Sequence, residues 1–471
     1  MGLFRFLNQW REKKDGTLEG PALSTESVNK TEHWIPAGAT VGEMNTIIAD
    51  AGPRSIIKWE PGDYPRLSAP IKVNSSHVEL RGPGWGSELL PEQDKQINLI
   101  EATGDADADT YLDRVIIQGF YVNGDKDNVS DGGDALNQCG IFMQNVRDAE
   151  IHRNYAYNTL YSNIRASRCP RIDIHHNRTE LTENIDNLSN KPPDNISIKN
   201  QMTGWAIHHN QCIDCGHQAI ETAADASNGA VHNNYVENAR SAAIQVHYSN
   251  HTPVYGNTVQ GGASAAIVVD NIGAPVYGNT VDGCAASAIR VKLAEGGPNP
   301  IWGNTLRNYG AHGIFCDVET SGLMVIGNTM GGGTNDGVRL TSSGGSVSHQ
   351  VAFNHIDGGR NGVRLQNNEG TKIVFNSIHN LDDPITADSA CTDVDVRGLI
   401  ESGNTGDVVL QGTRHRRNGI IGWFDGVDLS STTGQFRGDM AIADGTSAAS
   451  GGALAVWRGS GWDYYNPDGA V

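Results

Sequence analysis

A short pattern of apolar and polar positions recurs along the middle of the chain. It reads Val-Tyr-Gly-Asn-Thr-Val at 254–259, and related segments begin at residues 276, 301 and 325. Apart from one interval of 33 residues, successive copies of its Asn lie 22 to 28 residues apart; weaker copies place this Asn at 154, 177, 210, 234, 354, 376 and 404. A fixed period in this range is typical of a solenoid.

A second motif lies half a repeat further along and alternates as a short strand does. Its six copies run from Ala243-Ile-Gln-Val246 to Gly362-Val-Arg-Leu365. Because successive side chains of a strand point to opposite faces, every second residue falls on one buried face. We expect these inward residues to be Ile244, Val246, Ile267, Val269, Ile289, Val291, Ile314, Cys316, Val338, Leu340, Val363 and Leu365.

The segments between these strands contain mainly Gly, Asn, Ser and Ala, and they leave no room for a helix. Each repeat is therefore strand, turn, strand, turn, which predicts an all-β fold, a right-handed parallel β-helix solenoid over residues 35–410. About a dozen turns at about 4.8 Å each make a rod roughly 55 to 60 Å long. We expect the repeated Asn to adopt a left-handed turn and to bond to the equivalent Asn above and below.

One helix is predicted where the rod begins. Thr40-Val-Gly-Glu43 has the spacing of a capping box, and Gly52 is a typical helix stop. One side of the intervening segment is apolar, with Val41, Met44, Ile47 and Ile48. Such a helix covers the end of the apolar stack, where bare strand edges invite aggregation.

Composition agrees with this fold and excludes several classes of function. The chain has 57 Gly among 471 residues, 7% aromatic residues and no long apolar run, so we expect no transmembrane span. With 54 acidic and 35 basic residues the net charge is -19, and nucleic acid is a poor partner because no basic stripe exists. The seven Cys are an odd number and are expected to be reduced core residues.

These repeats resemble the pectate-lyase-like superfamily of β-helix proteins, with its nitrous-oxide-reductase-accessory-type repeats. The segments Ile56–Tyr64 and Val78–Gly84 also look like the first turns of phage tailspikes and polysaccharide lyases. This resemblance covers roughly residues 35–410. It implies the fold strongly and an activity only weakly.

The two ends of the chain differ from the repeats. Residues 1–34 are predicted to form a short anchor helix and a polar linker, without the long apolar segment of a secretory signal; the apolar positions at helical spacing are Leu3, Phe6, Leu7 and Trp10. Residues 411–471 are predicted to form a small β module that needs a partner surface. This module resembles the small carboxy-terminal segments of tail-associated proteins from viruses of haloarchaea. The low Lys count, 11 against 24 Arg, agrees with a halophilic source.

Outward residues of the second strand are predicted to stack into columns along the rod. One column reads Phe142, Arg165, Glu221, Gln245, Val268, Arg290, Phe315, Arg339, Arg364 and Thr386, and its neighbour reads His247, Asp270, Lys292, Asp317, Thr341 and Gln366. Such a polar face with aromatic interruptions suits sugars, although any solvated sheet face carries mixed charges. The predicted glycan-binding residues are Arg290, Phe315, Arg339, Arg364, Gln245, His247 and Lys292.

Candidate catalytic residues are only weakly indicated. Glycosidases commonly use two carboxylates, about 5 to 5.5 Å apart for retention or 6.5 to 9.5 Å for inversion. Asp270 and Asp317 share a column with one turn between them, roughly 9 to 10 Å apart at two rises of the stack. Glu221 is a further outward acid. A lyase would instead use a basic side chain to accept the proton, with a cation beside the uronate; the candidates are Arg290, Lys292 and Arg339.

Metal ligands are sparse in the sequence. The acidic segments 105–109 and 125–134 are candidate structural calcium loops, but Val129 stands where an EF-hand needs an oxygen ligand, so a solvated loop is favoured. Cys212-x-x-Cys215 has no second pair at zinc spacing. We therefore expect no metal site and no cofactor.

Together these features favour a virion structural protein: a tail spike, fibre or capsid spike that binds a host surface polysaccharide or glycoprotein for attachment. Resemblance to tailspikes implies a homo-oligomer, with a trimer preferred, and an N-terminus that contacts other virion proteins. Two alternatives stay open. One is a polysaccharide lyase or glycoside hydrolase on the same fold, and the other is a cell-surface adhesin.

Overall fold

The computed structural model describes residues 30–105, 110–128, 138–182, 194–262, 264–270, 273–292, 300–317, 322–342 and 348–411. Outside these ranges it describes the backbone of seven short strands: β1 (Arg11–Glu12), β2 (Leu18–Glu19), β45 (Arg416–Asn418), β46 (Ile421–Phe424), β47 (Met440–Ala443), β48 (Ala453–Trp457) and β49 (Trp462–Tyr465). The predicted anchor helix at residues 1–10 and most of both candidate calcium loops lie outside the described residues.

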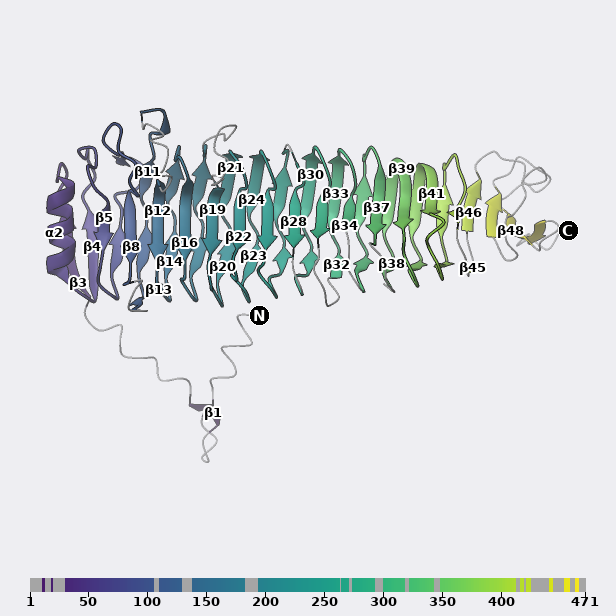
Figure 1. Ribbon diagram of the computed structural model, residues 1–471, viewed down its shortest axis with the longest axis horizontal. Helices are drawn as coiled ribbons and strands as arrows, with labels where there is room; N and C mark the ends of the chain where they lie inside the picture. Colours follow the sequence, from purple (N-terminus) through teal and green to yellow (C-terminus); the bar gives the residue numbers. More distant parts are fainter. Residues whose placement is uncertain are drawn as a thin grey trace.

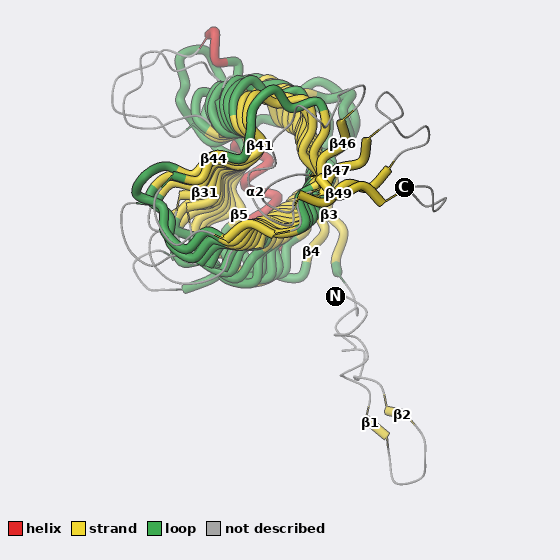
Figure 2. The backbone as a smooth tube through the Cα atoms, turned by 90° about the vertical axis from the view of Figure 1, so that its right-hand side faces the viewer, coloured by secondary structure: helices red, strands yellow, loops and turns green. Residues whose placement is uncertain are grey.

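The molecule is a rod of stacked coils, seen from the side in Figure 1 and from its end in Figure 2. It has about 14 turns, very little helix and strands that pair in parallel from one turn to the next. The predicted all-β parallel β-helix is thereby confirmed. Most turns contribute one strand to each of three faces, which we call the first, second and third faces.

The first face is a sheet of 16 strands: β3 (Thr31–Ile35), β4 (Ser55–Trp59), β6 (Glu79–Arg81), β10 (Ile116–Gln118), β14 (Glu150–His152), β17 (Asp173–His175), β20 (Ala206–His208), β23 (Ala230–His232), β26 (Val254–Tyr255), β29 (Val276–Tyr277), β32 (Pro300–Trp302), β35 (Met324–Ile326), β38 (Gln350–Ala352), β40 (Lys372–Val374), β42 (Asp395–Arg397) and β45.

The second face follows the first in each turn and contains β7 (Glu88–Leu89), β11 (Tyr121–Asn123), β15 (Tyr155–Tyr157), β18 (Arg178–Glu180), β21 (Gln211–Cys215), β24 (Tyr235–Ala239), β27 (Thr258–Gln260), β30 (Thr280–Cys284), β33 (Thr305–Tyr309), β36 (Thr329–Gly331), β43 (Ile400–Ser402) and β46. The third face contains β5 (Ile71–Val73), β8 (Ile100–Thr103), β12 (Cys139–Gln144), β16 (Ser162–Ser167), β19 (Asp194–Lys199), β22 (Ile220–Ala223), β25 (Ile244–His247), β28 (Ile267–Asp270), β31 (Ile289–Lys292), β34 (Ile314–Asp317), β37 (Asp336–Thr341) and β44 (Val409–Leu410). Two long strands, β39 (His355–Gln366) and β41 (Ser377–Ala387), run through both faces. A short 3-10 helix, η2 (Lys126–Asn128), and a pair of strands, β9 (Leu112–Asp113) with β13 (Val146–Arg147), complete the described elements.

The predicted capping helix is present as α2 (Val41–Ala51) at one end of the rod (Figure 1). Thr40 is its N-cap, and Thr40 and Glu43 form the reciprocal bonds of a capping box. Met44 and Ile48 are buried against the first turns, and Gly52 ends the helix with φ 63°. The helix therefore covers the apolar interior at the end of the stack of turns.

The interior is filled by the inward columns that the alternation predicts. All 12 inward residues of the third face that the sequence names are at most 1% exposed, including Ile289 and Val338. These residues belong to one continuous hydrophobic cluster, so each column is stabilised by apolar burial. The seven Cys are all unpaired and buried, as predicted.

A ladder of buried Asn side chains lines the corner between the first and second faces. Each amide Nδ2 donates to the Oδ1 of the Asn in the next turn, for example Asn257 to Asn279 at 3.0 Å. The ladder comprises Asn154, Asn177, Asn210, Asn234, Asn257, Asn279, Asn304, Asn328, Asn354 and Asn376. This confirms the predicted ladder, but the predicted left-handed backbone belongs to the preceding residue, such as Gly256 with φ 64°. That residue turns the corner, and the Asn after it can then point inward.

The parallel sheets extend past both expected domain boundaries. At the start, β3 begins at Thr31 and pairs with β4, so the last residues of the predicted linker belong to the first sheet. At the other end, β45 and β46 continue the first and second faces beyond residue 410. The backbones of β47, β48 and β49 then pair antiparallel. No helix among the described residues is long and apolar enough to cross a membrane.

Candidate functional site

The outward side chains of the third face form the column that the sequence predicts. Strand register aligns Arg290 with Phe315, and Phe315 with Arg339. Ser197 occupies the turn between Arg165 and Glu221, which the repeats alone leave open. The column therefore reads Phe142, Arg165, Ser197, Glu221, Gln245, Val268, Arg290, Phe315, Arg339, Arg364 and Thr386.

Phe315 lies between two guanidinium groups in this column. The Cζ atoms of Arg290 and Arg339 are 5.6 and 5.4 Å from the centre of its ring. These contacts are attractive because the face of an aromatic ring carries negative partial charge. Since the two Arg stand one turn to either side, they cover both faces of the ring. A ligand would therefore meet the ring edge and the outer N–H groups rather than an open stacking plane.

The other predicted glycan-binding residues lie on the same face but differ in their hydrogen bonds and exposure. Nη2 of Arg339 donates to Oε1 of Gln366 at 2.7 Å, which holds the guanidinium against the sheet. Gln245 accepts a hydrogen bond from Gln218 at 2.6 Å. Arg364 is half-buried one turn beyond Arg339, and Lys292 is exposed. Guanidinium, amide and ammonium groups thus line one continuous strip.

Asp270 does not face solvent as an open carboxylate. Its Oδ2 is 2.6 Å from Nδ1 of His247, and its side chain is only 10% exposed. The side chain of Asp317 lies outside the described residues, and the predicted pairing of Asp270 with Asp317 stays a prediction.

Glu221, the third candidate acid, belongs to a buried charged cluster that the sequence does not reveal. Its Oε2 is 2.5 Å from Nζ of Lys199 and 3.4 Å from the hydroxyl of Ser197. Asp194, at the start of β19, is fully buried and shares a hydrogen bond with Glu221. Nδ1 of His217 is 3.3 Å from Oδ1 of Asp194. Two carboxyl groups, one ammonium and one imidazole therefore meet beneath the third face.

The two carboxyl groups of this cluster have opposite pKa shifts. Burial raises the pKa of Asp194 well above its usual range, and the adjacent charge of Glu221 raises it further. Burial acts in the same direction on Glu221, but the Lys199 ammonium and hydrogen bonds from Asp194 and Lys199 outweigh it, so the pKa of Glu221 is lowered. Of the two carboxyl groups, Asp194 therefore holds a proton more tightly than Glu221 does. This division of roles is the one that general acid and base catalysis requires.

A pocket of about 310 Å³ lies beside this cluster on the third face. The guanidinium of Arg165 packs over the rings of Tyr161 and Phe142, at 4.7 and 5.9 Å. The lining residues are Asn98, Cys139, Phe142, Gln144, Arg165, Ser167 and Asn200. Amide, hydroxyl and guanidinium groups around an aromatic edge are suitable contacts for a sugar ring.

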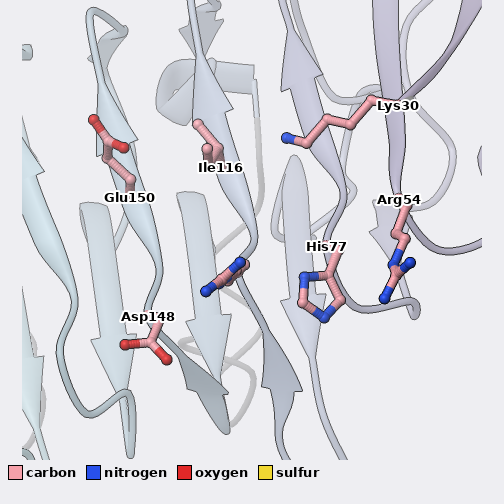
Figure 3. A pocket seen from close by; sticks show the side chains of 7 residues that line it. Lys30, Arg54, His77, Ile116, Asp148 and Glu150 are labelled. Atoms are coloured by element: carbon pink, nitrogen blue, oxygen red, sulfur yellow. The ribbon is translucent and has the colours of Figure 1, made fainter. Parts of the chain in front are cut away.

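A second pocket, of about 390 Å³, lies at the corner beside the first face, and the repeat pattern does not predict it. Figure 3 shows Lys30, Arg54 and His77 toward one side of it and Asp148 and Glu150 toward the other. Arg114 and Ile116 complete the lining. The pocket therefore offers cationic and anionic groups at opposite ends.

The middle of the chain matches a known family, described as periplasmic copper-binding protein (NosD). The matched ranges are residues 118–311 and 244–396, which overlap and together cover more than half of the chain. The chain belongs to the NosD family. This agrees with the predicted resemblance of the repeats to the nitrous-oxide-reductase-accessory type. No curated protein sequence matches this NosD-family chain.

Solved structures similar to this NosD-family chain are pectate-lyase-like β-helix proteins. The tailspike protein of the E. coli bacteriophage HK620, in complex with a pentasaccharide, has a TM-score of 0.58 at 12% identity, covering 95% of this chain and 87% of its own. The A-module of the Azotobacter vinelandii mannuronan C-5 epimerase AlgE6 has a TM-score of 0.51 at 15% identity, covering 78% and 96%. A Yersinia enterocolitica family 28 exopolygalacturonase has a TM-score of 0.50 at 13% identity, covering 86% and 82%. At these identities the likeness shows the fold alone.

Proposed function

We propose that this protein binds surface polysaccharide along the third face of its rod. The observation that carries the proposal is the stack of Arg290, Phe315 and Arg339, in which two guanidinium groups lie over the ring of Phe315 on the outward side of the sheet. Guanidinium groups bind carboxylates and hydroxyls through paired hydrogen bonds, and aromatic carbon contacts the apolar side of a sugar. The strip of half-buried polar groups extends this surface over several turns, enough for several sugar units.

In the same proposal the protein is a virion component, a tail spike, fibre or capsid spike that attaches the particle to a host glycan. The fold is similar to that of the HK620 tailspike, whose solved complex contains a pentasaccharide. Residues 1–34 would contact other virion proteins, residues 411–471 would form the C-terminal module, and three copies would associate into one spike. The NosD family is described as periplasmic, so the periplasm is the alternative location to the virion.

Binding is tested with a double variant, Arg290→Ala with Arg339→Ala. Adsorption of the purified protein to a panel of bacterial and archaeal surface polysaccharides is measured before and after the change. We expect at least a tenfold loss of adsorption, because the guanidinium contacts on both sides of Phe315 are removed. Both side chains are half-buried, and Arg339 also loses its hydrogen bonds to Gln366, so the free energy of unfolding should fall by about 1 to 3 kcal/mol, which a thermal melt measures separately from adsorption.

A matched control carries Arg307→Ala with Arg397→Ala, which removes the same charge from the second and first faces. We expect this control to adsorb as the unmodified protein does. If both double variants adsorb equally well, the third face is only solvated surface, and recognition lies elsewhere.

Cleavage of the bound polysaccharide is a second candidate function, favoured by the paired carboxyl groups of Asp194 and Glu221. The two carboxyl groups share a hydrogen bond, so they are closer together than the two acids of a typical glycosidase. Asp194 is fully buried, so Glu221 would be the carboxyl group that contacts the sugar and Asp194 would position it. If the protein is a hydrolase, Glu221→Gln should abolish release of reducing sugar ends. The pair expected from sequence, Asp270→Asn with Asp317→Asn, is the matched comparison. Absence of any released sugar from the unmodified protein would leave a binding spike or an adhesin.

The family description also names copper, so we ask whether any group of side chains in this chain could bind that ion. Glu150, His152 and His175 each offer one ligand atom, and these atoms lie within 4.8 Å of one another. Imidazole nitrogen with carboxylate oxygen is a donor set that copper and zinc accept. These residues therefore fit a metal ion, although the sequence predicts no metal site.

A further inference from the structure

One residue with a left-handed backbone forms the corner where each turn passes from the third face to the first. Several turns place Gly or Asn there, for example Gly204 with φ 68° and Asn228 with φ 55°. The corners that begin β4, β6 and β10 instead hold Arg54, His77 and Arg114, with φ of 63°, 60° and 54°. This backbone costs a residue with a Cβ about 1 to 2 kcal/mol more than it costs Gly. Three successive turns therefore keep long polar side chains at a position that favours Gly.

These three corner side chains line the pocket of about 390 Å³ beside the first face. The pairings of β4 with β6 and of β6 with β10 leave Arg54, His77 and Arg114 at the same position of three successive turns. Successive turns are about 4.8 Å apart, so the three side chains leave the backbone within about 10 Å. Lys30 and Ile116 complete this part of the lining. The volume lies in the range of small-molecule sites, about 300 to 1,000 Å³.

Two of the nitrogen-bearing side chains in this pocket have no partner in the protein. Among the residues that the structure describes, neither the Arg54 guanidinium nor the His77 ring forms a hydrogen bond or an ion pair. Lys30 differs from them, because its Nζ is 3.1 Å from Oε2 of Glu79. The donors of Arg54 and His77 are therefore available to a ligand.

The carboxylates at the opposite end of the pocket already have partners. Nη2 of Arg171 donates to Oδ2 of Asp148 at 2.8 Å, and this pairing lowers the pKa of Asp148. Oε1 of Glu150 is 2.8 Å from Nε2 of His175. The uncompensated charge of the pocket is therefore that of Arg54, although the whole chain has a net charge of -19. A concave site lined by cationic groups concentrates anions.

The arrangement of the donors favours a tetrahedral anion over a carboxylate. A carboxylate has two oxygens in one plane, and a single guanidinium binds both of them. A sulfate or phosphate ester has three terminal oxygens that point in three directions, which suits donors that come from three turns. Figure 3 shows Ile116 between the cationic side and the two carboxylates. An apolar side chain beside carboxylates suits a sugar ring, whose hydroxyl groups can donate to Asp148 and Glu150.

From this arrangement we propose that the corner pocket binds a sugar unit that carries a sulfate or phosphate ester. Arg54, His77 and Arg114 donate to the ester oxygens, and the apolar side of the ring contacts Ile116. A hydroxyl group at the far side of the ring donates to Glu150. This site lies apart from the strip of Arg290, Phe315 and Arg339 on the third face, so it does not depend on glycan binding there.

The test is calorimetry on the full chain with four probes: glucose 6-sulfate, glucose 6-phosphate, glucuronate and inorganic sulfate. We expect each ester to bind at one site per chain, at least about tenfold more tightly than glucuronate or inorganic sulfate, because only the esters combine a tetrahedral anion with a sugar ring. Added NaCl should weaken this binding, since salt screens exposed charges. If neither ester binds, or if glucuronate or inorganic sulfate binds as tightly, the inference is wrong.

The pocket variant is Arg54→Asn with His77→Asn. It should fold, because Asn228 occupies the same corner of a later turn with a left-handed backbone. The matched control is Arg153→Asn with His251→Asn, which makes the same two changes at exposed left-handed corners outside the pocket, with φ of 57° and 54°. We expect the pocket variant to bind the esters at least about tenfold more weakly and the control to bind them as the unmodified protein does.

Thermal melts of both variants check that each one is folded before affinities are compared. An equal loss of ester binding in the pocket variant and in the control would overturn the inference, because general charge and not the pocket would then be responsible. Arg290→Ala with Arg339→Ala should keep full ester binding. Failure of polysaccharide adsorption on the third face and failure of the corner pocket are thereby distinguished.

Discussion

Removal of one amide from the Asn ladder tests how the turns are held together. The Asn257 side chain donates to Asn279 Oδ1 at 3.0 Å and to the carbonyl of Val231 at 3.1 Å. Its Oδ1 accepts from both the backbone N–H and the side chain of Asn234, each at 3.0 Å. Asn257→Ala removes all of these bonds from a residue that is 1% exposed.

The cost can be worked out group by group. The amide of Asn234 keeps a bond to the carbonyl of Ile207 at 2.9 Å, and Asn279 Oδ1 keeps the bond from the backbone of residue 257 at 3.0 Å. The backbone N–H of Asn234 loses the partner that it has in the ladder. A buried group left without a partner costs about 1 to 3 kcal/mol, and the other lost bonds add about 1 kcal/mol in total. We therefore expect a loss of about 2 to 4 kcal/mol in the free energy of unfolding.

Urea unfolding followed by far-UV circular dichroism and by Trp fluorescence measures this loss. Agreement between the two probes checks that the rod unfolds cooperatively, which is required before free energies are compared. Asn233→Gly is the matched control, because the next turn has Gly256 at the same exposed corner. This control should lower the free energy of unfolding by less than about 0.5 kcal/mol. If Asn257→Ala were no more destabilising than this control, the ladder would contribute nothing to stability.

Three further predictions concern the core, the carboxyl pair and assembly. Ile289→Asp places an unpaired charge in the fully buried interior and should abolish soluble expression, whereas retained solubility with an unchanged melting temperature would contradict the inward assignment. The folded protein holds the Asp194 proton that the unfolded chain releases near pH 3.8, so stability should fall as the pH rises above that value. In thermal melts, Asp194→Asn should lessen this fall between pH 5 and pH 8. An equal dependence of melting temperature on pH in both proteins would count against the raised pKa. Light scattering should show a trimer. A monomer at micromolar concentration in both low and molar salt would contradict the proposed three-chain spike.

The repeat made the fold and one part of the site predictable. Residues such as Arg290, Phe315 and Arg339 occupy the same position in successive motifs, so their stacking follows from the period alone. Asp194 was missed because it lies in the one interval of 33 residues, where the spacing no longer gives the register. Its partner Glu221 was found only as an isolated acid. Their meeting depends on the bonds of β19 with β22, which the sequence pattern does not define there.

The group formed by Glu150, His152 and His175 was missed for a different reason. His152, His175, His208 and His232 all stand two residues before a ladder Asn, so their alignment was available from the same period. A search for metal spacing within one element does not detect them, because ligands of a β-helix come from successive turns. The left-handed corner was also assigned to the wrong residue, since Gly and Asn are adjacent there and both tolerate positive φ.

The direction of the hydrogen bonds between turns has a mechanical consequence. These bonds and the Asn ladder run along the rod, so a pulling force applied at its two ends loads them in series and detaches one coil at a time. With 22 to 28 residues in most coils, each detachment frees roughly 75 to 95 Å of extended chain. A compressive load along the rod instead presses neighbouring coils together and meets the packed interior. Such a rod is stiff when pushed against a surface and yields stepwise when pulled away from it.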